Sequence, residues 1–238
     1  MVKNILKGEY DFIFGAGEAC ACSSALRSNG LQFESYPLDW LYGGDFRTRT
    51  DLIISGFRDF INQKDLVKVG EREHPLPCDI YQNQRNKIVF NHDFALHQEL
   101  DKTYPAVKEK YDRRIKRLYA NIDQAKDILI VYISTPSKKV KIRKTIPLIK
   151  ECFKDIQNKF PDKNIKLLYL GHKKWRLPIT LKWKLSKDVL FLVTNYRNRD
   201  KNTEPFVVED KVLVKILKHI RLNKNVIKNH EPKSWVMQ

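Results

Sequence analysis

Residues 128–134, with the sequence ILIVYIS, form a continuous apolar run of the length that a buried strand needs. Regular alternation follows: apolar residues recur at helical spacing over 146–160, and strand-like apolar runs cover 165–170 and 189–194. A further helical pattern covers 208–222. Strands that alternate with helices are typical of parallel sheets, because each crossover helix packs on a sheet face. The pattern predicts an α/β fold with a mainly parallel sheet and helices on both faces.

The N-terminal half adds a strand and three helices to this prediction. The apolar run over 10–14 ends at the glycine turn of residues 15–17, and we expect this strand in the same sheet. Helices are expected over 18–29, over about 45–61, and in a long segment after Pro105.

The segment before the long helix is less regular. Residues 63–86 are polar and contain Pro75 and Pro77, which predicts irregular structure, and 87–90 resemble a short strand that ends next to His92. No repeat or low-complexity linker divides the chain.

The domain prediction follows from this continuity. We expect one α/β domain over 1–222, with the cysteine and histidine elements in 11–100 and the regular alternation in 103–222. Residues 223–238 are expected to be a loosely attached basic tail.

Composition excludes several classes of protein. The chain has 238 residues, of which 42% are hydrophobic, as in packed globular proteins. No apolar run approaches the roughly 20 residues of a membrane-spanning helix, and the first residues lack the apolar core of a secretory leader. We therefore expect a soluble cytoplasmic protein without a membrane span, whose four cysteines are reduced.

The formal net charge of +17 is concentrated in one stretch. From Lys138 to Lys187, 16 Lys or Arg residues stand against three acidic ones. Such a field attracts phosphates, acidic glycans or anionic lipid surfaces. The charges are mostly lysines that do not alternate with stacking aromatic residues, so a solvated surface is the favoured interpretation and nucleic acid is not an expected partner.

Cys20 is the best candidate for a reactive group. It lies in the first turn of the predicted 18–29 helix, where the helix dipole and free backbone amides favour a thiolate. His92, at the end of a predicted strand, is the candidate base. Asp39 or Asp93 would orient the imidazole, and the sequence does not choose between them. Gly17 and the amides at the helix start would stabilise an oxyanion.

The same glycine turn also supports a nucleotide-binding interpretation. Residues 15–20, GAGEAC, match G-x-G-x-x-G except that cysteine replaces the last glycine, and Glu34 lies near the spacing of a ribose-binding acid. The missing glycine and the loop that follows Glu34 weaken this interpretation.

Two further groups of residues contain side chains that could bind a ligand. Cys20, Cys22, His74 and Cys78 are ligand types for zinc, but their spacing differs from that of zinc sites, so no metal and no cofactor is expected. Arg113, Arg114 and Arg117 on the predicted long helix could bind an anionic substrate group, or could form a solvated face.

Several of these residues resemble a known family. The matching motifs are Gly17-x-x-Cys20, Gly30-Leu31, Ser35-x-Pro37-x-Asp39-Trp40, Asn91-His92-Asp93-Phe94 and Tyr111-Asp112-Arg113-Arg114. They resemble the pattern of a family of unknown function named as putative papain-like cysteine peptidases, over about residues 11–135. Leu38 stands where that family usually has Phe, and a second cysteine, Cys22, stands beside the first.

The resemblance implies that Cys20 is the nucleophile and His92 the base, and it carries an association with bacterial surface-polysaccharide loci. It also implies a cysteine helix packed on an antiparallel sheet, which differs from the parallel alternation after residue 128. We expect a cysteine-dependent hydrolase or acyl-transfer enzyme, specifically a thiol peptidase acting on a peptide or other acyl substrate. The alternative is a nucleotide- or nucleotide-sugar-binding transferase of surface polysaccharide synthesis, and a third option is a non-catalytic binding protein for an anionic glycan.

Overall fold

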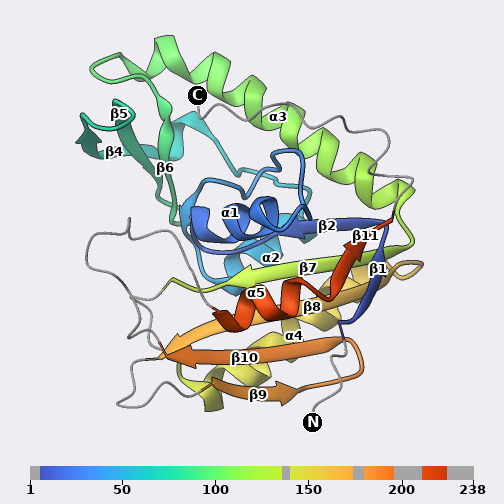
Figure 1. Cartoon of the computed structure of the whole chain (residues 1–238). Coiled ribbons are helices and arrows are strands. Elements are labelled where there is room, and N and C mark those ends of the chain that lie inside the picture. The colour runs from blue at the N-terminus through green and yellow to red at the C-terminus, as the bar shows by residue number, and fades with distance from the viewer. Residues whose placement is uncertain (1–5, 136–139, 174–179, 196–210, 224–238) are drawn as a thin grey trace.

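The structure is a computed structural model that describes residues 6–135, 140–173, 180–195 and 211–223. Its central sheet has the strand order β2-β7-β8-β10-β9. The strands are β2 (Phe12–Gly15), β7 (Asp127–Ile133), β8 (Asn164–Lys173), β10 (Val189–Asn195) and β9 (Thr180–Lys184). The first four are parallel neighbours, and β9 runs antiparallel at the edge (Figure 1). The parallel sheet is therefore present where the alternation predicts it.

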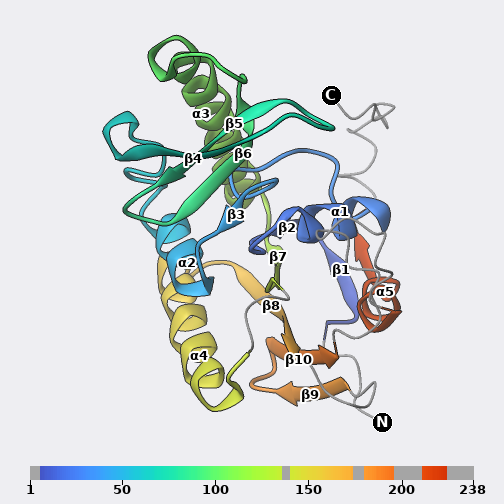
Figure 2. The ribbon, with the colours of Figure 1, turned by 90° about the vertical axis from the view of Figure 1, so that its left-hand side faces the viewer.

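Helices lie on both faces of this sheet (Figure 2). The helices are α1 (Cys20–Ser28) and α5 (Lys211–Leu217) on one face, and α2 (Phe46–Ile54) and α4 (Ile142–Lys159) on the other. Two hydrophobic clusters correspond to the two faces, because alternate residues of a strand point to opposite sides. Leu129 of β7, for example, packs in the cluster with α1, whereas Ile130 packs in the other.

A second sheet corrects the prediction of a mainly parallel fold. Its order is β3-β6-β5-β4, and all its neighbours are antiparallel. The strands are β3 (Tyr42–Gly43), β6 (Ile88–Phe94), β5 (Cys78–Asn83) and β4 (Leu66–Arg72), and the 25-residue helix α3 (Leu100–Gln124) packs against them. The chain is thus a mixed α/β protein with parallel and antiparallel sheets.

The prediction that 63–86 is irregular was wrong. A short 3-10 turn, η1 (Gln63–Asp65), leads into β4, most of whose side chains are exposed. A bulge between Lys68 and Gly70 interrupts the alternation that would have marked a strand. The two prolines lie in the connection between β4 and β5, where no ladder hydrogen bond is needed.

Two predicted helices end earlier than expected. Helix α2 begins after Asp45, whose side chain caps the Thr48 amide at 2.9 Å, and it ends at Ile54 because Gly56 has a φ of +73°. The C-terminal helix ends at Leu217, and β11 (Ile220–Leu222) pairs in parallel with β1 (Gly8–Tyr10). The predicted start of this helix at 208–210 and the predicted tail after 223 lie outside the described residues.

One hydrophobic core joins the two sheets. Phe14 of β2, Phe90 of β6 and Tyr111 of α3 belong to the same buried cluster. Strand β2, which leads into α1, and the antiparallel sheet are therefore held by shared packing. In the described ranges, no helix has the length and apolarity that crossing a bilayer requires.

Candidate active site

The turn between β2 and α1 fixes Cys20 as the first residue of α1. Backbone bonds from Ala16 and Glu18 to the neighbouring strand continue the ladder of β2 past its end, at 2.8 and 3.0 Å. Between them, Gly17 allows α1 to approach closely, because a Cβ there would lie 2.5 Å from the Cβ of Cys22. The glycine turn thus sets how close the cysteine helix lies to the sheet.

Asp39 stabilises the loop that follows α1. The carboxylate is fully buried and accepts from the Ser23 hydroxyl at 2.6 Å, the Gln32 amide at 2.5 Å and the Tyr36 backbone N–H at 2.7 Å. Burial raises the pKa of Asp39, although the hydrogen bonds from Ser23 and Tyr36 and the charges of Arg27 and Arg114 oppose the shift. Its oxygens are thus occupied by donors from α1 and from this loop.

A buried arginine stabilises the next part of the same loop. Arg49 on α2 is completely inaccessible to solvent and donates to the carbonyls of Leu38, Leu41 and Gly43 at 3.2, 3.1 and 2.8 Å. Buried Glu18 lies close enough for its charge to act on Arg49. A buried cation of this kind persists only when it is fully hydrogen-bonded.

His92 reaches Cys20 from the antiparallel sheet. The distance from Cys20 Sγ to His92 Nε2 is 3.6 Å, within hydrogen-bond reach for sulfur. Cys20 in α1 is half-buried, whereas the His92 side chain in β6 is exposed as a whole although its ring is partly desolvated. The structure therefore brings together two side chains that lie 72 positions apart in the sequence.

The other ring nitrogen of His92 faces an arginine. Arg72, the last residue of β4, lies with Nη2 2.9 Å from His92 Nδ1. The same guanidinium donates to the carbonyl of Asn91 at 2.7 Å and to that of Leu76 at 3.0 Å. The position next to the imidazole that the sequence analysis gave to an aspartate is therefore taken by a cation.

Asp93 points away from His92, because consecutive residues of a strand face opposite sides. Its carboxylate forms an ion pair with Lys110 and accepts from the Tyr111 hydroxyl at 3.0 Å, both on α3. In the described part of the chain, neither Asp93 nor Asp39 forms a hydrogen bond with His92. The orienting role predicted for one of them stays a prediction without a contact.

The ionisation of the pair differs from the expectation of a thiolate. Burial raises the pKa of the Cys20 thiol to about 11, against the opposing effects of its own backbone N–H, Arg49 and Arg72. Burial also lowers the pKa of His92, and the positive charges of Arg72 and Lys110 lower it further, while Asp93 raises it. Both shifts have the same effect: they favour the uncharged forms, a thiol next to a neutral imidazole.

The three arginines of α3 that are predicted to bind an anion each have a different partner. Arg113 forms an ion pair with Glu109 on the exposed side of the helix. Arg114 lies over the ring of Tyr111 at 5.3 Å. Arg117 donates to the Ser35 carbonyl at 2.9 Å and pairs with Glu34 at 3.2 Å. Glu34, the acid that the nucleotide-binding interpretation requires for the ribose, is therefore already paired with Arg117.

No group of three His, Cys, Asp or Glu side chains in the described ranges is arranged to hold a metal ion. Of the four residues considered for zinc, Cys22 is buried with its Sγ 3.2 Å from the Val131 carbonyl, and Cys78 donates to the Asn91 carbonyl at 3.0 Å. Both thiols therefore have backbone partners.

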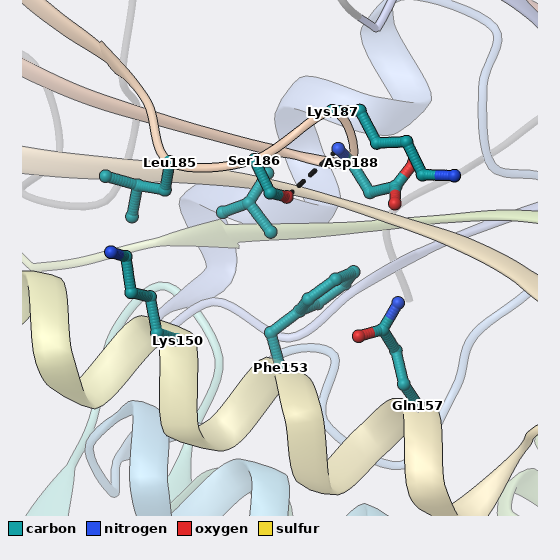
Figure 3. Close-up of a pocket in the computed structure, with 8 residues that line it drawn as sticks. Lys150, Phe153, Gln157, Leu185, Ser186, Lys187 and Asp188 are labelled. Atoms are coloured by element: carbon teal, nitrogen blue, oxygen red, sulfur yellow. Dashed lines mark hydrogen bonds between the residues drawn. The ribbon is translucent and has the colours of Figure 1, made fainter.

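A surface pocket of about 410 Å³ lies elsewhere, between α4 and the turn from β9 to β10. Figure 3 shows Lys150, Phe153 and Gln157 of α4 facing this turn, in which the Asp188 amide donates to the Ser186 hydroxyl at 3.1 Å. Its lining includes no cysteine or histidine, so the pocket is separate from the Cys20–His92 pair.

Comparison with known proteins identifies the family. The family model described as "Putative papain-like cysteine peptidase (DUF1796)" matches residues 11–174, and the chain belongs to this family. The matched region contains both Cys20 and His92.

A curated relative is the "Uncharacterized protein R408" of Acanthamoeba polyphaga mimivirus, which is 28% identical over 129 residues. That match covers 48% of this chain and 58% of the viral protein, so it spans little more than half of the relative. No solved structure matches the chain.

Sequence reasoning missed Arg72, Arg49 and Glu18. Arg49 left a usable signal, because it lies at helical spacing between Phe46 and Ile53, on the apolar face of α2. Arg72 has no such signal in the sequence, because only the pairing of β4, β5 and β6 brings it next to His92.

Proposed function

We propose that this protein is a cysteine-dependent hydrolase of peptides or other acyl substrates, with Cys20 as nucleophile and His92 as proton carrier. The observation that carries the proposal is the 3.6 Å contact between Cys20 Sγ and His92 Nε2, at the start of a helix and beside an antiparallel sheet. Membership of a family described as papain-like cysteine peptidases supports it.

The resting thiol and neutral imidazole favour general-base chemistry. His92 takes the Cys20 proton as sulfur attacks the acyl carbon, and the carbonyl oxygen becomes an oxyanion. This tetrahedral intermediate then collapses, and the bond to the leaving group breaks. The leaving group takes the proton from the imidazolium, and the acyl group remains on Cys20 as a thioester. Water then attacks the thioester, with His92 again taking and returning a proton, and releases the acid.

Stabilisation of the oxyanion is assigned to backbone groups and to nearby positive charge. The Cys20 backbone N–H lies beside its own sulfur, and Arg49 and Arg72 are close enough for their charges to stabilise negative charge there. Gly17 contributes by permitting the close approach of α1 to β7.

The test uses matched pairs of variants. Purified protein is incubated with a peptide mixture and with p-nitrophenyl acetate, and new peptide termini and released nitrophenol are measured. Cys20→Ala and His92→Asn should each lower turnover at least 100-fold, because general-base and nucleophilic groups typically contribute that much.

Cys22→Ala and His97→Asn are the controls. Cys22 lies on the same helix as Cys20 but is buried, and His97 is exposed and pairs with Glu71 at 3.2 Å. Turnover that persists in Cys20→Ala, or that falls equally in the controls, would contradict the proposed function.

A further inference from the structure

The contact between Arg72 and His92 fixes which ring nitrogen carries the proton. A guanidinium only donates hydrogen bonds, so His92 Nδ1, 2.9 Å from Arg72 Nη2, must offer its lone pair. A neutral imidazole has one N–H, and it then lies on Nε2, the atom that faces Cys20 Sγ. In this arrangement, His92 points a donor at the thiol.

That tautomer conflicts with the proposed chemistry. The proton of Cys20 can pass to Nε2 only if Nε2 is bare, which requires the neutral ring to carry its proton on Nδ1. After the transfer, the imidazolium would also present an N–H to the guanidinium, and two donors would face each other. The contact with Arg72 and the base role of His92 therefore exclude each other.

The surroundings of Arg72 favour a negatively charged ligand. In the described residues, the further partners of Arg72 are two backbone carbonyls and the Cys78 thiol, and Arg72 forms no ion pair with a carboxylate. The other charges that act on the pair are those of Arg49, Lys110, Asp39 and Asp93. Asp93 is already paired with Lys110, and Asp39 is held by hydrogen bonds from Ser23, Gln32 and Tyr36. A half-buried guanidinium without an acidic partner, beside a nucleophile, is a binding group for a carboxylate.

We propose that Arg72 binds a carboxylate of the substrate, and that this binding draws the guanidinium away from His92 Nδ1 so that His92 can accept the Cys20 proton. The inference rests on the proposed function, and it assigns the substrate class: acyl compounds that carry an acidic group next to the bond that is cleaved. In the free protein, the contact with Arg72 keeps the pair inactive.

Two thiol reagents of similar shape test the binding of a carboxylate. Iodoacetate and iodoacetamide differ in one charged group and react with the same thiolate, so their rate ratio at Cys20 is independent of how much thiolate is present. Arg72→Met should lower the ratio of iodoacetate to iodoacetamide about tenfold. Arg85→Met removes the same charge at the other end of β5 and β6, where Arg85 pairs with Asp65, and should leave the ratio unchanged. An equal ratio in wild type and Arg72→Met would overturn the proposal.

Nitrogen-15 NMR of the imidazole tests the tautomer without any turnover. In the free wild-type protein, His92 should carry its proton on Nε2, and in Arg72→Met the population with a protonated Nδ1 should rise. A wild-type His92 protonated on Nδ1 would also overturn the proposal.

The two failures are distinguishable. A protein without hydrolase activity that still shows the Nε2–H tautomer and the Arg72-dependent reagent ratio would contradict the proposed function and support the role of Arg72. A protein with Cys20-dependent hydrolase activity, whose ratio of iodoacetate to iodoacetamide rates is the same in wild type and Arg72→Met, would support the proposed function and contradict the role of Arg72.

Discussion

The reactivity of Cys20 should depend on pH as that of a buried neutral thiol does. With a pKa of about 11, the thiolate fraction at pH 7 is on the order of 10⁻⁴, against about 3% for an ordinary cysteine with a pKa near 8.5. Because only the thiolate reacts, alkylation of Cys20 at pH 7 should be about 300-fold slower than that of free cysteine. The rate should rise about tenfold with each pH unit from 6 to 10.

The assay is iodoacetamide labelling followed by peptide mass spectrometry. The Cys22→Ala background is used because Cys20 and Cys22 lie between the same pair of tryptic sites, Lys7 and Arg27. The protein unfolded in urea is the control and should react like free cysteine. A rate that is already high and flat between pH 5 and 8 would show a thiolate–imidazolium pair and refute the argument from desolvation.

Three substitutions test what supports the site. Arg49→Met leaves the carbonyls of the 38–44 loop without their donor, and urea unfolding should show a loss of at least ~3 kcal/mol in the free energy of unfolding; an unchanged midpoint contradicts the anchoring role. Gly17→Ala places a Cβ against Cys22 and should cost about 1–3 kcal/mol, measured by thermal unfolding, whereas Gly8→Ala, with open space around it, is the neutral control. Asp93→Asn should cost about 1–3 kcal/mol by weakening the contact with α3; a changed His92 tautomer in the NMR spectrum would instead restore Asp93 as its orienting partner.

The parallel sheet was predictable because its strands are buried on both faces. Residues of β7 from Ile128 to Ile133 are all buried, so the apolar run was continuous and the helices around it kept clear spacing. β4 could not be recognised in the same way, because it lies at a sheet edge with most side chains exposed and carries a bulge. This difference explains why residue periodicity does not indicate the antiparallel sheet, which only the family resemblance implies.

The candidate site was predictable only in part. The glycine turn and the position at a helix start singled out Cys20, and the end of the predicted strand over 87–90 singled out His92. The structure places the two side chains 3.6 Å apart, but β6 continues to Phe94, so His92 lies within the strand and not at its end. The ionisation could not be predicted, because the helix dipole can be read from sequence whereas desolvation depends on the packed surroundings. Arg72 could not be found either, since its contact depends on the register of three strands.

Chemical cross-linking tests the central pairing most directly. A reagent with two electrophilic carbons, 1,3-dibromoacetone, can bridge a thiol and an imidazole only when they lie a few ångströms apart. In the Arg72→Met protein, whose His92 can hold its proton on Nδ1 and leave Nε2 bare, treatment at pH 9 followed by peptide mapping should give a cross-link between Cys20 and His92. Adding His92→Asn should abolish this cross-link, and adding His97→Asn should not. Cys20 modified without a bridge to His92, or bridged to another histidine, would contradict the account.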